Sequence, residues 1–171
     1  MQNRLAWRSN DIVMTELHVA YLNLGSNIQP ETNLLRAVQL LLKYGEIQKV
    51  SNVWESEPAG SEGPNYLNAC IQFNSTFGMV ELKEQVIRPI EAQLGRERTS
   101  DKYSPRTIDI DIVLFDDKQV NGDFWEEAYV VIPLAEIYPE YQNPVTAEKI
   151  IQTAARLRRR VWLEKRQGVL G

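Results

Sequence analysis

The spacing of apolar residues predicts that strands and helices alternate along the first half of the chain. Residues 19–25 (VAYLNLG) form an apolar run typical of a short buried strand. Residues 30–44 begin with a proline and repeat apolar side chains at helical spacing, which predicts a helix. Two runs with strand character, 47–54 and 66–77, flank a Pro- and Gly-rich loop over 57–64, so they can pair as antiparallel neighbours.

A second helix and a further strand complete this pattern. Residues Met79–Leu94 repeat apolar positions at helical spacing, Gly95 ends the helix, and Pro89 predicts a kink within it. A polar segment, 96–106, leads into a clear strand over 107–115. The resulting β-α-β-β-α-β order is typical of a ferredoxin-like α+β fold, in which an antiparallel sheet carries both helices on one face.

The last third gives weaker signals. We expect a short strand or turn near 120–122, an apolar segment at 128–134 and a helix near 146–158. Six basic residues and Trp162 lie in the tail 156–166, which we interpret as a solvated C-terminal helix with the indole packed on the body.

An RNA-binding module is an alternative, because RNA-recognition domains share the β-α-β-β-α-β order and the tail is basic. Two acids on the central strand and a net charge of −4 oppose it, because a phosphate backbone attracts positive charge.

Length and composition favour one compact domain. The chain has 171 residues, and we expect a loose extension over 1–16, or translation from Met14, before a single domain over 17–171. One cysteine, Cys70, and one histidine, His18, exclude an intrachain disulfide and a structural zinc site, and both are expected to be packed residues. The lone cysteine favours a cytoplasmic location, no apolar run approaches the roughly 20 residues that span a bilayer, and a monomer is expected.

The strand at 107–115 carries the clearest candidate chemistry. Strand alternation puts every second side chain on one face, namely Asp109, Asp111, Val113 and Phe115. The other face is apolar: Ile108, Ile110, Ile112 and Leu114. Two carboxylates about 6.6–6.8 Å apart along a strand repel near an apolar core, and a divalent cation such as Mg²⁺ removes that conflict. An Asp-x-Asp pair alone is a weak signal, because acids at a solvent-exposed strand end look the same.

Basic residues before this strand strengthen the hypothesis of a metal site. Arg96, Arg98, Lys102 and Arg106 all lie within fifteen residues of Asp111. Acids that carry a metal beside arginines suit a polyphosphate, whose non-bridging oxygens the guanidinium groups can clamp. The sequence contains neither a P-loop nor a G-x-G-x-x-G motif, so a nucleotide would bind through metal and arginine.

Tyr66 and Asn68 lie two residues apart on a predicted strand, so one face offers a ring and an amide. Such a pair can hold a flat heterocycle by stacking and hydrogen bonding. A cross-strand tyrosine and a solvent-facing amide would give the same pattern, so this signal is weak by itself.

Together these residues resemble those of the 6-hydroxymethyl-7,8-dihydropterin pyrophosphokinase family of folate biosynthesis. The similarity spans Val19 to Phe115 and is weaker around 132–138. It rests on Leu24-Gly25-Ser26-Asn27, Tyr66-Leu67-Asn68, Glu91 with Gly95-Arg96-x-Arg98 and, most specifically, Pro105-Arg106-Thr107-Ile108-Asp109-Ile110-Asp111. The resemblance implies a three-layer α/β/α ferredoxin-like fold and ATP-dependent transfer of a pyrophosphoryl group to the pterin hydroxymethyl, with release of AMP.

The resemblance also implies a role for each matching residue. The catalytic set would be Arg96, Arg106, Asp109 and Asp111, in which the two acids bind two Mg²⁺ and the arginines hold phosphates. The ATP-binding set would be Glu91, Arg96, Arg98, Arg106 and Ile112. The pterin-binding set would be Ser56, Ala59, Tyr66, Asn68, Tyr103 on a closing loop, and Tyr129 as a second aromatic face. The expected partners are these small-molecule substrates, with neither nucleic acid nor membrane.

One segment departs from the family pattern. Residues 116–131 (DDKQVNGDFWEEAYVV) are several residues shorter than usual and contain no histidine or arginine. The histidine and arginine that help the family to hold ATP therefore have no counterpart, and Glu57 stands where a proline often occurs. This departure leaves open an alternative function, a non-catalytic or altered-specificity relative that binds a pterin or a nucleotide.

Overall fold

The structure is a computed structural model that describes residues 15–60, 62–120 and 122–171. The extension expected over 1–16 lies, up to residue 14, outside the described residues. Within the described ranges, seven strands form one antiparallel sheet in the order β6-β5-β1-β4-β3-β7, and β2 also pairs with β4. The strands are β1 (His18–Ser26), β2 (Glu46–Val50), β3 (Val53–Ser56), β4 (Tyr66–Ser75), β5 (Asp109–Phe115), β6 (Lys118–Gln119) and β7 (Leu163–Arg166).

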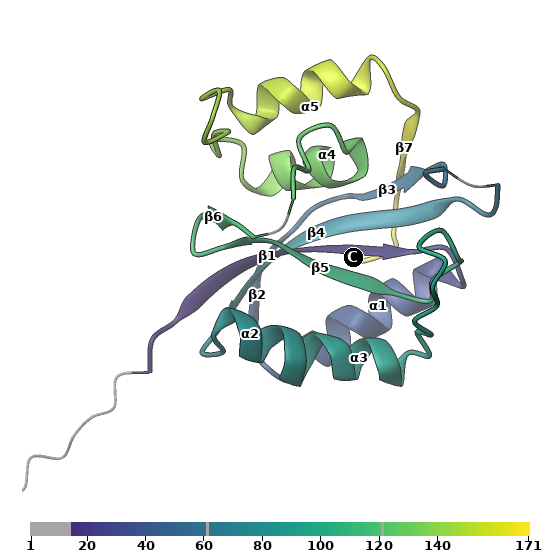
Figure 1. Cartoon of the computed structure of the whole chain (residues 1–171), viewed down its shortest axis with the longest axis vertical. Helices are drawn as coiled ribbons and strands as arrows, with labels where there is room; N and C mark the ends of the chain where they lie inside the picture. Colours follow the sequence, from purple (N-terminus) through teal and green to yellow (C-terminus); the bar gives the residue numbers. More distant parts are fainter. Residues whose placement is uncertain (1–14, 61, 121) are drawn as a thin grey trace, which may run out of the picture.

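Helices cover both faces of this sheet, as Figure 1 shows. One face carries α1 (Pro30–Leu41) and a second, continuous helix made of α2 (Met79–Glu81), the π-helical turn η1 (Leu82–Ile87) and α3 (Arg88–Gln93). The other face carries α4 (Ala128–Ile137) and α5 (Ile150–Arg158). The predicted ferredoxin-like α+β fold with three layers is confirmed.

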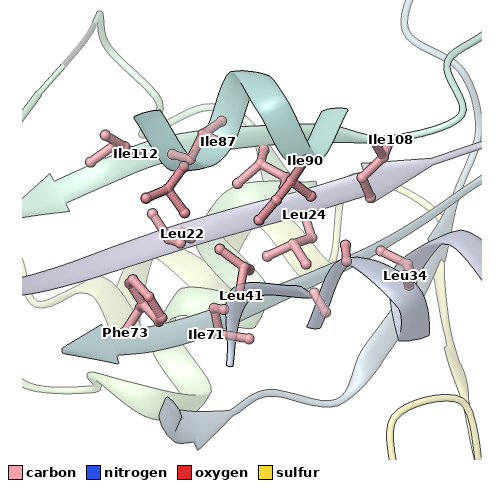
Figure 2. Close-up of a cluster of buried hydrophobic side chains, with 14 of the residues drawn as sticks. Leu22, Leu24, Leu34, Leu41, Ile71, Phe73, Ile87, Ile90, Ile108 and Ile112 are labelled. Atoms are coloured by element: carbon pink, nitrogen blue, oxygen red, sulfur yellow. The ribbon is translucent and has the colours of Figure 1, made fainter. Parts of the chain in front are cut away.

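Side-chain alternation along the strands builds a hydrophobic core on each face. The core beneath α1 and α3 includes Leu22, Leu24, Leu34, Leu41, Phe73 and Ile90 (Figure 2). The core between the sheet and α4 includes Tyr21, Trp54, Cys70, Leu114 and Leu134. Helix α4 lies between the sheet and α5, which explains why the segment 128–134 is apolar on nearly all sides. Strands β1 and β5, which carry the candidate site, contribute side chains to both cores.

Strand β5 changes its alternation once. The register with β1 shifts at Val113, which bulges out of the ladder. Val113 and Leu114 therefore both pack toward α4, and Phe115 reaches the opposite core. The predicted alternation is wrong for Leu114 and Phe115 because of this bulge. It holds for Asp109 and Asp111, which precede the bulge and line the same two pockets.

The kink predicted at Pro89 is a π-helical turn. Proline has no N–H to continue the α-helical ladder, and over η1 the Arg88 N–H donates to the carbonyl of Lys83, five residues back. The last helix begins at Ile150 rather than at the predicted Thr146. Residues before it form a β-bridge and include Ala147 at a φ of 60°, which an α-helix does not accommodate.

The basic tail forms strand β7, so the predicted C-terminal helix over this segment is wrong. β7 pairs with β3 along its whole length, which fixes the tail at the sheet edge. Trp162 is 47% exposed rather than packed on the body, and Arg158 instead lies 4.6 Å from the ring centre of Trp54. The Arg166 guanidinium binds the Glu55 carboxylate at 2.7 Å. Acidic neighbours thus neutralise part of the charge on which the RNA-binding alternative depended.

Candidate functional site

Two pockets meet at the carboxylates of Asp109 and Asp111, near the start of β5. The first, which we call the sheet pocket, has a volume of about 300 Å³ and lies between the sheet and α4. Its lining residues are Asn23, Gly25, Ser56, Glu57, Pro58, Ala59, Tyr66, Asn68, Lys102, Tyr103, Arg106, Asp109, Asp111, Glu127, Tyr129 and Val130. The second, the helix pocket, has a volume of about 360 Å³ and lies between β5 and the helix α2–α3. Its lining residues are Met79, Val80, Lys83, Glu84, Ile87, Arg88, Glu91, Arg96, Arg98, Asp109, Ile110, Asp111, Ile112 and Val120.

The floor of the sheet pocket presents a fixed amide. Asn68 is buried on β4, and its Nδ2 donates to the Ser56 hydroxyl at 2.8 Å and to the Trp54 carbonyl at 3.3 Å. These two bonds use the NH₂ group, so the Oδ1 atom remains as an acceptor. Gly25 on the neighbouring strand leaves room for it, because a Cβ there would lie 3.2 Å from this oxygen. The floor can therefore accept a hydrogen bond without rearranging.

Tyrosines form the walls of the sheet pocket. Tyr66 stands at the start of β4, Tyr103 on the loop before β5, and Tyr129 in the first turn of α4. Burial raises the pKa of Tyr66, and burial together with the nearby carboxylate of Glu127 raises the pKa of Tyr129, so both phenols stay neutral. Neutral rings on several sides of a fixed amide suit a flat, polar heterocycle.

Two loops meet above the sheet pocket. Gly60, with a φ of 72°, approaches Tyr103 so closely that a Cβ would lie 2.8 Å from a ring carbon. The loop that carries Tyr103 is tied inward by Arg106, whose Nη2 donates to the Lys102 carbonyl at 2.5 Å. The backbone N–H of Arg106 in turn donates to Asn27 Oδ1 at 2.8 Å. Asn27, directly after β1, thus anchors the arginine that precedes β5.

Asp109 is held between two arginines. Arg96 Nη1 donates to one carboxylate oxygen at 2.5 Å, and Arg106 Nη1 donates to the other. Arg96 also bonds Glu91, so one guanidinium bridges two acids. Each pocket therefore contains one arginine that is already paired with Asp109, Arg106 in the sheet pocket and Arg96 in the helix pocket.

Glu91 is the internal partner of the basic side chains. It is only 3% exposed, and it accepts bonds from Arg96, from Arg98 at 2.9 Å and from the backbone N–H of Ile110 at 2.9 Å. Burial raises the pKa of Glu91, while the Ile110 N–H and the two arginines favour its charged form. The contact with Ile110 satisfies a donor on a stretch of β5 that β6 does not cover. Glu91 thus fixes the helix α3, both arginines and the strand edge relative to one another.

Asp111 differs from Asp109 in having no partner. Among residues 15–60, 62–120 and 122–171, its carboxylate accepts no hydrogen bond and forms no ion pair, and the side chain is exposed to the pockets. Desolvation by the surrounding walls, followed by the charges of Asp109 and Glu91, raises the pKa of Asp111 to about 6. A free carboxylate with a raised pKa, next to a second acid, is the environment that a cation stabilises.

Where the two pockets meet, the candidate oxygen ligands for a metal are the carboxylates of Asp109 and Asp111. No cluster of three or more His, Cys, Asp or Glu side chains in the described ranges could hold a metal ion by itself. Mg²⁺ suits such a site, because it usually binds one or two carboxylates together with waters and substrate phosphates.

Every site residue singled out from the sequence lines one of the two pockets. The residues expected to bind a pterin line the sheet pocket, together with Arg106. The helix pocket is lined by Glu91, Arg96, Arg98 and Ile112. His18 and Cys70 lie elsewhere: His18 Nδ1 bonds Asp116 at 2.6 Å, and Cys70 is fully buried. Both are packed residues, as predicted.

Sequence reasoning missed several lining residues. On the sheet-pocket side these include Asn23 and Glu127, and on the helix-pocket side Met79, Val80, Lys83 and Arg88. For Asn23, the one signal in the sequence is strand alternation, which places Asn23 and Gly25 on the same face of β1. Their position opposite Asp111 and Asp109 depends on the register between β1 and β5, which the sequence does not specify. Glu127, just before α4, lies in the segment that departs from the family pattern. None of the described helices is long and apolar enough to cross a membrane.

Comparisons with known proteins agree with this geometry. The family model for 7,8-dihydro-6-hydroxymethylpterin-pyrophosphokinase (HPPK) matches residues 21–139. The chain is 33% identical over 160 residues to the 2-amino-4-hydroxy-6-hydroxymethyldihydropteridine pyrophosphokinase of Bacillus subtilis, covering 86% of this chain and 92% of that protein. It is 31% identical over 148 residues to the Synechocystis protein of the same name, covering 80% of this chain and 75% of the relative.

A solved structure supports the fold. Wild-type HPPK-DHPS of Plasmodium falciparum, crystallised with pterin and p-hydroxybenzoate, has a TM-score of 0.63 over 82% of this chain, with 14% sequence identity. This chain spans 43% of that longer protein. The matched residues 21–139 contain every lining residue of both pockets, including the acid pair at which the pockets meet. The chain belongs to the 7,8-dihydro-6-hydroxymethylpterin-pyrophosphokinase family.

Proposed function

We propose that the protein transfers a pyrophosphoryl group from ATP to the hydroxymethyl group of 6-hydroxymethyl-7,8-dihydropterin, releasing AMP, as a step of folate biosynthesis. Membership of the family supports this function. The single observation that carries it in the structure is that Asp109 and Asp111 lie where two differently built pockets meet. That position suits the transfer of a charged group between two substrates, one in each pocket.

The sheet pocket would hold the pterin. Asn68 Oδ1 offers a fixed acceptor, Tyr66 and Tyr129 offer rings, and Ser56 keeps the Asn68 amide in place. Ala59 and Tyr103 belong to the two loops above the pocket, which would exclude water once the pterin is bound. Exclusion of water prevents hydrolysis of ATP in place of transfer.

The helix pocket would hold ATP. Arg96 and Arg98 line this pocket and supply planar donors for phosphate oxygens, and Ile112 supplies an apolar surface on the nucleotide side. Arg106 lines the sheet pocket beside Asp109 and supplies a further donor where the two pockets meet. Because Arg96 and Arg106 bind Asp109 in this structure, they would have to turn from this carboxylate to the phosphates. Glu91 would keep its bonds and so limit how far Arg96 moves.

Asp109 and Asp111 fit a site for Mg²⁺, with two ions expected for the family. The fit rests on the unpartnered carboxylate of Asp111 and on an all-oxygen donor set. When bound, the cation neutralises charge on the polyphosphate and favours the ionised form of the pterin hydroxyl. The protein itself aligns the hydroxyl oxygen with the β-phosphorus of ATP, so that the new O–Pβ bond forms as the bond from Pβ to the AMP oxygen breaks.

An activity assay tests this function. We expect incubation with Mg²⁺, ATP and 6-hydroxymethyl-7,8-dihydropterin to yield AMP and the pterin pyrophosphate in equal amounts, by chromatography and ³¹P NMR. Formation of ADP would instead indicate an ordinary kinase. Binding of both substrates in calorimetry without AMP would support the alternative of a non-catalytic relative, which the short segment 116–131 favours. The cytoplasmic location and the monomeric state stay predictions.

A further inference from the structure

Asn23 is a polar residue in the centre of the sheet that has no part in the proposed function. It lies in the middle of β1, is only 5% exposed, and lines the sheet pocket. Its cross-strand partners are Asp111 on β5 and Cys70 on β4. A buried amide thus stands directly beside the unpartnered carboxylate of the candidate site.

The Asn23 amide has no hydrogen-bond partner in the described ranges. Its Oδ1 atom is buried without a partner, and its Nδ2 atom makes no hydrogen bond to the described residues either. Asn68, on the next strand, is by contrast fixed by two donated bonds. The protein therefore orients one amide of the pocket floor and leaves the other for a ligand.

An asparagine is unfavourable here unless a ligand uses it. The neighbours of Asn23 on the same face, Tyr21 and Cys70, belong to the hydrophobic core beneath α4. A buried amide without a partner destabilises the fold, whereas an apolar residue would extend that core. A structural role does not explain the amide.

The position of Asn23 opposite Asp111 indicates which ligand its amide would contact. Directly opposed residues on one face of an antiparallel pair have Cβ atoms about 4.5–5.5 Å apart, yet Asn23 and Asp111 form no direct hydrogen bond. The two side chains can therefore share an atom placed between them. We propose that Asn23 positions the cation at Asp111 by accepting, through its amide oxygen, a hydrogen bond from a water of the cation's coordination shell. This inference rests on the proposed function, because it requires a cation at Asp109 and Asp111.

Manganese binding tests the inference without measuring turnover. Mn²⁺ prefers the same oxygen ligands as Mg²⁺, and its free concentration is measured by electron paramagnetic resonance. The titration uses the full chain with a non-hydrolysable ATP analogue. We expect Asn23→Ala to weaken Mn²⁺ binding about 10- to 100-fold, the usual effect of removing an outer-shell partner. Asn23→Asp keeps an acceptor oxygen at the same place and retains at least the wild-type affinity.

Asn74→Ala is the matched control. Asn74 also has a buried, unpartnered Oδ1, but it lies on β4 opposite Val19 and Glu46 and lines neither pocket. We expect this variant to bind Mn²⁺ like the wild type. The thermal midpoint of metal-free Asn23→Ala, followed by circular dichroism, should be no lower than that of the wild type, since the variant loses an unsatisfied group.

The outcomes separate two failures. Wild-type affinity in Asn23→Ala, within twofold, would overturn the role of Asn23 and leave the cation site intact. A loss in Asn23→Asp equal to that in Asn23→Ala would also overturn it, because the acceptor oxygen would then be irrelevant. If the wild type binds no Mn²⁺ beyond that held by the free analogue, the proposed cation site fails, and the role of Asn23 fails with it.

Discussion

The sheet pocket and the helix pocket have similar volumes and share Asp109 and Asp111, yet they are built for different ligands. Neutral rings and a fixed amide oxygen dominate the sheet pocket, whose cationic lining is limited to Lys102 and Arg106. The helix pocket is rimmed by four basic side chains, namely Lys83, Arg88, Arg96 and Arg98. The same acid pair can thus lie next to a neutral heterocycle on one side and a polyanion on the other, because the aromatic lining of one pocket and the basic lining of the other favour different ligands.

The pockets also differ in how far they are organised before a ligand binds. In the sheet pocket, Asn68 already points its free oxygen at the ligand, so binding requires little rearrangement. In the helix pocket, Arg96 is occupied by Glu91 and Asp109, and at the junction of the pockets Arg106 is occupied by Asp109, so both arginines must exchange partners to bind phosphates. We therefore expect the pterin side to act as a rigid template and the ATP side to rearrange.

The largest effect is expected at the shared acids. Asp111→Asn should reduce AMP formation by about 10³-fold or more, because removal of one charged ligand weakens the cation site on which both pockets depend. The metal-free variant should be at least as stable as the wild type, since Asp111 has no partner in the described part of the chain and repels Asp109. Asp109→Asn should lose activity equally but unfold more easily, because two arginines lose their acceptor. Equal stability of both variants, by thermal unfolding, would contradict this difference.

The next largest effect is expected at Arg96, whose substitution should affect only one of the two pockets. Arg96→Ala should weaken binding of an ATP analogue about 100-fold while changing pterin affinity little, since its guanidinium lines the helix pocket alone. Calorimetric titration of each ligand provides the measurement. Arg160→Ala removes an exposed arginine outside both pockets and serves as the charge-matched control. Equal losses for both ligands would mean that the pockets are not independent.

Tyr129 gives the converse result. Tyr129→Ala should weaken pterin binding about tenfold and leave the ATP analogue unaffected, because the ring lines the sheet pocket alone. Tyr129→Phe keeps the ring and should retain most of the affinity. A loss in the phenylalanine variant as large as in the alanine variant would assign the effect to the hydroxyl instead.

Acid should weaken the cation site. The pKa of Asp111 is about 6, and a metal binds the ionised form, so affinity for Mn²⁺ should fall about tenfold per pH unit below 6. Acid has the opposite effect on the stability of the metal-free protein. Because the pKa of Asp111 is raised in the fold, protonation of Asp111 stabilises the fold, and this contribution is fully present below the ordinary pKa near 4 and is lost as the pH rises through about 6. Titrations between pH 5 and 8 check the first effect, with Asp111→Asn as the control that lacks this step.

The smallest effect is expected at Gly25. A Cβ at this position would lie 3.2 Å from Asn68 Oδ1, whose amide cannot retreat without losing its two bonds. Gly25→Ala should therefore weaken pterin binding about fivefold, equivalent to about 1 kcal/mol of crowding. Gly63→Ala, where nothing lies within 4 Å of the added Cβ, is the matched control. Unchanged pterin affinity in Gly25→Ala would show that the amide is free to move.

The success of sequence reasoning depended on whether a feature is local. Asp109, Asp111 and Arg106 lie within one short segment, so alternation and composition suffice to place them at one site. Asn23 and Asp111 are brought together only by the register of β1 with β5, which no local pattern specifies. The bulge at Val113 likewise inverts an alternation that looked regular.

The tail shows the other limit of sequence reasoning. Residues 163–166 carry no strongly apolar face, and they become strand β7 because the edge of β3 offers free backbone groups. Tertiary pairing of this kind outweighs local propensity. The apolar segment 128–134 lacked helical periodicity for a related reason, because α4 is buried on nearly every side.

A crystal structure with Mg²⁺, a non-hydrolysable ATP analogue and the hydroxymethyl pterin tests the shared acid pair most directly. We expect the cation to bind Asp109 and Asp111, Arg96 and Arg106 to have turned from Asp109 to phosphate oxygens, and the heterocycle to lie on Asn68. If both arginines still hold Asp109 while nucleotide and metal are bound elsewhere, the two pockets do not serve one transfer reaction.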